Sequence, residues 1–268
     1  MVFETIGIGE LLAANLVAVA TMMLLLWLIS IPLGDVSFID SFWAFGFVLI
    51  GCVTVRLFPF GGVHAQILTT LVVVWGLRLG LYLLWRWRRE GADGRYLALT
   101  KKAKGNVHLY TLLNVFALQG ALMWIVSLPL QLGQYGAMGE PGPLALAGTA
   151  LAIAGILFES IGDWQLARFK GVEANRGKVL DSGLWRYTRH PNYFGDLCFW
   201  WGCYLVACEA PYGWMSIPGP AIMTFLLVKW SGAALLERRV QRSRPAYADY
   251  MRRTSAFIPW PPKAGSGV

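Results

Sequence analysis

The sequence predicts an all-α integral membrane protein, folded as a bundle of seven transmembrane helices. Of its 268 residues, 56% are hydrophobic and only 14% are charged, and the mean hydropathy is +0.52. Soluble domains carry about 25% charged residues. Long apolar runs also recur along the chain, separated by short polar segments. Both observations exclude a soluble globular domain and indicate a multi-pass membrane protein.

Seven apolar runs account for the expected helices, although the sixth is short and polar residues interrupt the second. A transmembrane helix needs about 20 mostly apolar residues. The runs lie at residues 11–33, 39–58, 64–85, 109–132, 144–167, 193–209 and 214–236. The first lacks the basic flank and cleavage site of a signal peptide, so we expect it to remain as a helix. We expect one membrane domain over residues 1–262 and a disordered tail at 263–268.

Lysine and arginine residues form three clusters that seven spans place on one face of the membrane. Of the 23, seven lie at residues 86–104, six at 168–189 and seven beyond residue 237. The amino terminus and the connections after the fourth and sixth spans carry none. Because cytoplasmic loops are rich in Lys and Arg, this pattern predicts an amino terminus outside and a cytoplasmic carboxyl terminus. Topology thus accounts for the net charge of +8, and no nucleic-acid partner is implied.

Two carboxylates stand where the second helix is expected to begin. Asp35 follows Pro-Leu-Gly and fits two roles, a helix N-cap or a contact to a polar ligand. Asp40 lies within the apolar run, with Trp43 three positions later. Because a carboxylate is costly in a membrane, Asp40 indicates a cavity or a charged partner.

The third helix carries Arg78 near its middle, where a guanidinium costs roughly 3 kcal/mol. We expect it to pair with Asp40 or Glu159, either as a structural ion pair or within a site. Tyr82, four residues later, can present a phenol to the same cavity or simply pack at the interface. The charged connector at residues 88–107 is expected to be a cytoplasmic loop that could cover a ligand.

The fifth helix changes character along its length. Small residues at Gly148, Ala152 and Gly155 permit close packing against another helix. Near its end, Glu159 and Asp163 stack four residues apart on one face. Two carboxylates so close repel each other unless a cation or polar ligand lies beside them. The pair is therefore either a ligand site or a salt bridge to the basic loop that follows.

The stretch 180–196 gathers most of the polar chemistry of this apolar protein between two helices. Its cations can hold anionic groups, and its hydroxyl, amide and carboxyl groups can form hydrogen bonds. The residues concerned are Arg186, Arg189, His190, Tyr187, Asn192, Tyr193 and Asp196. A basic loop that contacts lipid phosphates is the alternative interpretation. A basic, aromatic tail at 242–262 could close over this region.

The segment Gly-Leu-Trp-Arg-Tyr-Thr-Arg-His-Pro-Asn-Tyr-Phe-Gly-Asp at 183–196 resembles bacterial membrane proteins of the steroid 5-alpha-reductase superfamily. The likeness extends from Asp35 to Pro259 and is strongest over 163–196. It implies a seven-helix enzyme of the bacterial inner membrane that reduces the carbon–carbon double bond of a lipophilic conjugated enone, such as a 3-oxo-delta-4 steroid. NADPH would bind on the cytoplasmic side, the substrate would enter from the bilayer, and no obligate protein partner is implied.

The resemblance also implies roles for particular residues. Positions that match cofactor contacts of the family are Asp163, Lys178, Asn192 and Asp196. The wider expected NADPH site adds Glu159, Lys170, Arg186, Tyr187, Arg189, His190, Tyr193, Arg238 and Arg239. For the enone, Asp40 would be the acid, assisted by Tyr82 or Arg78, with Asp35, Trp43 and Trp75 contacting the substrate. Eukaryotic members carry a Gln-Glu pair and a His-Tyr pair instead; Asp40 is the nearest acid here, and Trp75 stands at the Tyr position.

Two other functions stay open at this point. Isoprenylcysteine and phospholipid methyltransferases share an Arg-His-Pro-x-Tyr-x-Gly motif but bind S-adenosylmethionine. Asn192 and the acidic second helix favour the reductase, and basic residues suit the 2′-phosphate of NADPH better than a sulfonium cation. A lipid-binding scaffold without enzymatic activity is the third class. Neither a Rossmann nor a Walker motif is present, and no His/Cys cluster indicates a metal.

Overall fold

The computed structural model describes residues 6–59, 62–136, 139–230, 237 and 246–263. Over these residues the chain is helical and forms no β-strand. Five helices in this part are long and apolar enough to cross a membrane: α1 (Ile8–Leu33), α2 (Ile39–Leu57), α3 (Gly62–Glu90), the helix Val107–Val126 and α8 (Pro143–Lys170). The predicted all-α class is confirmed, and the helices have the length and composition of a multi-pass membrane protein.

Shorter elements complete the described chain. The helix Val107–Val126 consists of α5 (Val107–Thr111), a π-helical turn η1 (Leu112–Ala117) and α6 (Leu118–Val126). The others are α4 (Gly94–Thr100), α7 (Leu128–Leu132), η2 (Glu173–Asn175), η3 (Gly183–Arg186), α9 (Pro191–Ala207), η4 (Gly213–Ser216), α10 (Pro218–Phe225), η5 (Leu226–Trp230) and α12 (Ala246–Arg253). The expected sixth span corresponds to α9, which has 17 residues. The expected seventh begins in α10 and η5 and runs on into 231–236, outside the described residues.

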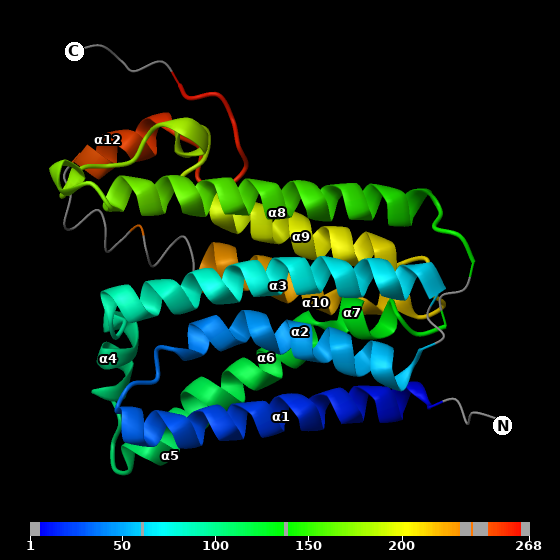
Figure 1. Cartoon of the computed structure of the whole chain (residues 1–268). Helices are drawn as coiled ribbons and strands as arrows, with labels where there is room; N and C mark the ends of the chain where they lie inside the picture. The colour runs from blue at the N-terminus through cyan, green and yellow to red at the C-terminus, as the bar shows by residue number, and fades with distance from the viewer. Residues whose placement is uncertain (1–5, 60–61, 137–138, 231–236, 238–245, 264–268) are drawn as a thin grey trace. The chain divides into compact units, whose positions relative to one another are not determined.

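The chain forms two compact units, one of Met1–Ala147 with Cys203–Gly219 and the other of Gly148–Gly202 with Pro220–Val268. In the first unit α2 and α3 lie side by side (Figure 1). Gly76 of α3 approaches α2 so closely that a Cβ there would come within 2.9 Å of the Ala44 carbonyl oxygen. Beside it the buried rings of Phe47 and Trp75 meet edge to face, 5.8 Å between centroids. This antiparallel pairing brings the start of α2 and the end of α3 together.

Polar side chains tie α1 to its neighbours in the first unit. Asn15 Nδ2 donates a buried hydrogen bond to Thr54 Oγ1 of α2 over 2.9 Å. Trp124 Nε1 of α6 donates to the Leu12 carbonyl over 3.0 Å. Within a membrane such bonds between helices satisfy groups that lipid cannot.

The first turn of α8 is capped from another segment of the same unit. The Glu209 carboxylate accepts hydrogen bonds from the backbone N–H groups of Gly142 at 2.8 Å and Ala145 at 2.9 Å. These are amides that a helix leaves without internal partners at its start. His64 Nε2 of α3 lies 2.7 Å from the same carboxylate. One acid therefore joins the starts of α3 and α8.

In the second unit α8 and α9 pack backbone to backbone at glycine positions. A Cβ on Gly155 would lie 2.5 Å from the Gly195 carbonyl oxygen, and one on Gly202 would lie 2.5 Å from the Gly148 carbonyl oxygen. The small-residue face predicted for the fifth helix is thus confirmed as a packing surface. Because the backbones touch, side chains at 159, 163, 192 and 196 are held at a shared face of the two helices.

Gly202→Ala tests this contact. The added methyl group would overlap the α8 backbone, which cannot move aside as a flexible side chain would. We therefore expect the free energy of unfolding to fall by about 1–3 kcal/mol. Gly9→Ala is the matched control, since its Cβ would meet nothing within 4 Å. Thermal unfolding of the detergent-purified variants measures both. Equal melting temperatures for the two variants would contradict the close packing.

Candidate functional site

A polar cluster at the start of α2 surrounds Asp40. The Tyr96 hydroxyl donates a hydrogen bond of 2.5 Å to Asp40 Oδ1, and Arg95 Nη2 lies 2.7 Å from Asp40 Oδ2. Gln119 Nε2 of α6 donates to the Tyr96 oxygen over 3.0 Å. Both partners of Asp40 come from α4, which starts after Asp93 because that carboxylate accepts the Arg95 backbone N–H over 2.8 Å. A charged partner was expected for Asp40, and in the structure it is Arg95, a residue that was not among the candidates.

Electrostatics keeps the Tyr96 phenol neutral and the Arg95 guanidinium charged. Burial raises the pKa of the Tyr96 phenol well above its usual value of 10.0, and the neighbouring Asp40 carboxylate raises it further. Burial disfavours the charged form of Arg95, but the carboxylates of Asp40 and Asp93 outweigh it and raise the pKa of this guanidinium. Tyr96 is thus a neutral phenol beside a permanent cation, an arrangement that can donate a hydrogen bond and stabilise negative charge.

Asp35 lies next to this cluster in a structural role. Its carboxylate accepts hydrogen bonds from the Ser37 backbone N–H and from Trp87 Nε1, each over 2.7 Å. The helix starts later, at Ile39, with Phe38 as N-cap. The N-cap interpretation of Asp35 is therefore wrong: its side chain forms a local turn with Ser37 and joins α2 to α3.

The remaining candidates of the first unit lie along α2 and α3. Trp75 is fully buried against Phe47, and the Trp43 ring also packs on this phenylalanine at 5.4 Å between centroids. The Tyr82 ring stacks with that of Trp85 at 6.0 Å. Arg78 is half-buried in α3. The ion pair of Arg78 with Asp40 or Glu159 stays a prediction. Asp40 already contacts Arg95 and Tyr96.

Arg95 and Tyr96 were missed from the sequence. The connector 88–107 was expected to be a loop, whereas residues Gly94–Thr100 form α4. Asp93, an acid of the kind that caps helices at their start, was a readable N-cap signal. No spacing pattern indicated that Arg95 and Tyr96 would contact Asp40, which lies 55 and 56 positions earlier in the chain.

The second unit holds three buried carboxyl groups on α8 and α9. Glu159, Asp163 and Asp196 are exposed by only 3%, 5% and 8%. Asn192 Nδ2 donates a hydrogen bond to Asp163 Oδ1 over 3.2 Å. The sequence predictions placed these four residues in one cofactor site. The structure brings Asp163 and Asn192 into direct contact.

Arg189 and His190 share one carboxylate. Arg189 Nε lies 2.7 Å and His190 Nε2 lies 3.0 Å from the same oxygen of Glu237. Arg189 Nη1 also donates to the carbonyl oxygens of Met251 and Thr254, at 3.1 and 2.6 Å. In this structure Arg189 is therefore occupied in holding the carboxyl-terminal segment. His190 stacks on Tyr193, with 5.4 Å between ring centroids.

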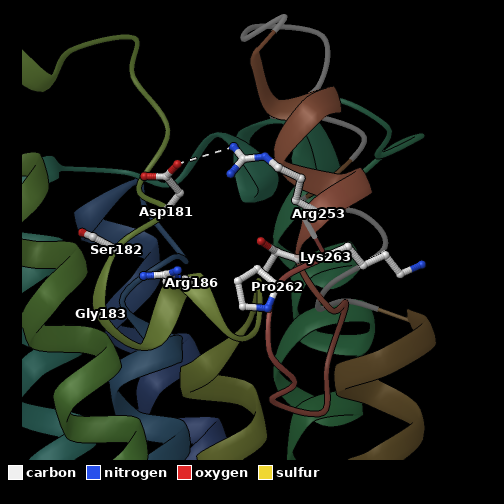
Figure 2. A pocket seen from close by; sticks show the side chains of 8 residues that line it. Asp181, Ser182, Gly183, Arg186, Arg253, Pro262 and Lys263 are labelled. Atoms are coloured by element: carbon white, nitrogen blue, oxygen red, sulfur yellow. Dashed lines mark ion pairs between the residues drawn. The ribbon is translucent and has the colours of Figure 1, made fainter. Parts of the chain in front are cut away.

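The carboxyl-terminal segment packs on the stretch between η3 and α9, as expected for the tail. Thr188 Oγ1 donates to the Phe257 carbonyl over 2.7 Å. The Trp260 backbone N–H donates to the Tyr187 carbonyl over 2.9 Å, and the Tyr250 hydroxyl donates to the Trp185 carbonyl over 2.5 Å. This closure also fixes the walls of a hollow of about 470 Å³, shown in Figure 2. Its lining includes Arg186.

The other predicted cofactor residues lie at the surface of the second unit. Lys170 at the end of α8, Lys178 after η2, and Arg186 are exposed. The Tyr187 side chain is also exposed. Arg238 and Arg239 lie outside the described residues.

A family model described as "Protein of unknown function (DUF1295)" matches residues 26–254, which include the cluster around Asp40 and the buried carboxyl groups of α8 and α9. The chain is a DUF1295 protein. No curated protein and no solved structure matches it. Because the family description states no reaction, the function of this DUF1295 protein has to follow from its side chains.

Glu237→Gln tests the shared carboxylate. Burial opposes the charge of Glu237, but hydrogen bonds from His190 and Arg189 lower its pKa below the usual 4.5. A lowered folded-state pKa means that the charge stabilises the protein fully above about pH 4.5 and ceases to do so as the pH falls through the folded-state value. At pH 7 we expect the variant to be less stable by about 1–3 kcal/mol, and the difference to shrink below pH 4.5.

Thermal unfolding of both proteins between pH 7 and pH 3 measures this difference. Glu173→Gln is the control, because Glu173 forms an ion pair with Arg176 in which both side chains are more than 80% exposed. A stability difference for Glu237→Gln that stays constant with pH would show that the carboxylate charge has no part in holding the segment.

Proposed function

We propose that this DUF1295 protein is an NADPH-dependent reductase of the carbon–carbon double bond of a lipophilic conjugated enone that enters from the bilayer. Its apolar helices suit a substrate dissolved in lipid. The proposal includes seven spans, with α9 and the helix that begins at α10 as the sixth and seventh. The basic clusters support an outside amino terminus, a cytoplasmic carboxyl terminus and a cytoplasmic cofactor side in a bacterial inner membrane.

The hydrogen bond from Tyr96 to Asp40 carries the proposal. Hydride addition to the β-carbon of an enone places negative charge on the carbonyl oxygen. That oxygen must be polarised by a donor that is still protonated at neutral pH. Tyr96 meets this need, because burial and the Asp40 carboxylate raise the pKa of its phenol. Arg95, whose guanidinium lies 5.7 Å from the centre of the Tyr96 ring, supplies a compensating positive charge.

The residues that would hold the cofactor lie in the second unit. The buried carboxylates of Asp163 and Asp196 can accept hydrogen bonds from ribose hydroxyls or a carboxamide. Asn192, already bonded to Asp163, can donate and accept at the same place. The exposed cations Lys170 and Lys178 suit phosphate groups. This donor set fits a nicotinamide dinucleotide without a Rossmann domain.

Bound NADPH would supply the hydride that adds to the β-carbon of the substrate. As the π electrons move to the carbonyl oxygen, Tyr96 turns its O–H from Asp40 and donates its proton there. Arg95 then offsets the negative charge of the phenolate. Solvent protonates the α-carbon while the enol O–H returns its proton to the Tyr96 phenolate, and this leaves the saturated ketone. The net reaction consumes one NADPH and one proton.

Asn192→Ala tests cofactor binding in a thermal-shift titration of the detergent-purified protein. NADPH should stabilise the wild-type protein by several degrees near saturation and should have a much weaker effect on the variant. NADH and S-adenosylmethionine are titrated in parallel. Stabilisation by S-adenosylmethionine instead would favour a membrane methyltransferase, and no response to any of the three would favour a lipid-binding scaffold.

Tyr96→Phe tests the acid. Removal of the hydroxyl should lower enone turnover about 10²–10⁴-fold while the NADPH-induced thermal shift is retained. Asp40→Ala should also abolish turnover with NADPH binding retained. Tyr82→Phe, which removes only the hydroxyl of the ring that stacks on Trp85, is the control and should keep its activity. Unchanged turnover in Tyr96→Phe would remove Tyr96 from the mechanism.

A further inference from the structure

The hollow between the η3 turn and the carboxyl-terminal segment has the features of a ligand site. Its volume of about 470 Å³ lies within the range of roughly 300–1,000 Å³ typical of small-molecule pockets. One wall is formed by residues 181–186 and the other by 253–254 and 262–263. Both walls belong to the second unit.

The charge of the lining is predominantly positive. Arg186, Arg253 and Lys263 line the hollow together with one acid, Asp181. In Figure 2 the guanidinium groups of Arg186 and Arg253 come from opposite walls, and Lys263 extends outward from the rim. The contact between Arg253 and Asp181 is long, at 3.6 Å. A single carboxylate at that distance leaves a net positive field in the hollow.

Arg186 has no structural task that accounts for its place. It is exposed, and among the residues that the structure describes none forms a hydrogen bond or ion pair with its guanidinium. Arg253, by contrast, also donates to Asp249 over 2.8 Å and so stays fixed on α12. The hollow therefore combines one anchored guanidinium with one that is available to a ligand.

The walls are held in place without the ligand. Gly183 adopts φ +61°, and a Cβ there would meet the Gln165 side chain at 2.3 Å. Gln165 Oε1 in turn accepts the Leu184 backbone N–H over 3.0 Å. On the other wall the Lys263 backbone N–H donates to the Arg253 carbonyl over 3.0 Å. A preformed site of this kind loses little conformational entropy when it binds.

We propose that this hollow binds a phosphate group, held between the guanidinium groups of Arg186 and Arg253. Paired guanidinium groups suit the tetrahedral oxygens of phosphate and form strong, charge-assisted hydrogen bonds with them. The polar, exposed lining does not suit an apolar enone. The phosphate could belong to an anionic lipid headgroup or be free in solution, and the chemistry of the site is the same. The inference does not rest on the proposed reductase activity.

The test is a thermal-shift titration of the detergent-purified full chain at constant ionic strength. The ligands are inorganic phosphate, short-chain phosphatidic acid and, as the zwitterionic control, short-chain phosphatidylcholine. We expect a rise of about 2–4 °C for a ligand near tenfold excess over its dissociation constant. Arg186→Ala should raise the half-saturating concentration about tenfold or more, and Arg186→Lys should restore part of the affinity.

Arg176→Ala is the matched control, because Arg176 is an exposed cation of the same basic loop that pairs with Glu173 and does not line the hollow. A response to both phosphate ligands that depends on Arg186 indicates that a free phosphate is sufficient. A response to phosphatidic acid alone that depends on Arg186 indicates a lipid headgroup. If neither response changes in Arg186→Ala, or if Arg176→Ala weakens it equally, the proposed site is wrong.

Discussion

A charged side chain enclosed among apolar helices needs a partner, and this constraint organises both units of the protein. Asp40 would be costly at the start of a transmembrane helix if α4 did not bring Arg95 and Tyr96 to it. Glu237 plays the converse part, because it is the carboxylate that Arg189 and His190 require. In the Arg189–Glu237 pair, whose side chains are 8% and 14% exposed, removal of one member would leave a mostly buried charge without its partner. These contacts hold α4 in the first unit and the segment at 251–254 in the second.

Helix packing supplies the other condition for a site. In the second unit, glycines let α8 and α9 touch through their backbones. Carboxyl groups at 159, 163 and 196 are consequently held at a shared face and not exposed to lipid. In the first unit the antiparallel α2 and α3 place the start of one beside the end of the other, which is why Asp35 can accept the Trp87 indole N–H. Polar groups in this protein cluster where helix ends or glycine contacts permit it.

The two sets of polar groups differ in the chemistry that they support. The phenol of Tyr96 and the guanidinium of Arg95 are suited to a developing negative charge on a substrate oxygen. The carboxylates and the amide of the second unit are suited to hydroxyl and amide donors, such as those of a nucleotide. An enone reductase needs both kinds of group. A methyltransferase of the isoprenylcysteine type needs a nucleotide site but has no evident use for a neutral phenol bonded to a carboxylate.

Composition and spacing alone determined the all-α class, the apolar helices, the packing role of the small residues on α8 and the polar character of residues 180–196, because these properties depend on local sequence. Helical spacing also placed Glu159 and Asp163 on one face. Only the tertiary structure decided which polar side chains contact one another. Nothing local links Asp40 to Tyr96 or Arg189 to Glu237, or places Arg186 and Arg253 at one hollow, since each pair is separated by more than 45 positions. Such contacts arise when whole helices and loops pack, and that depends on the summed burial of many side chains.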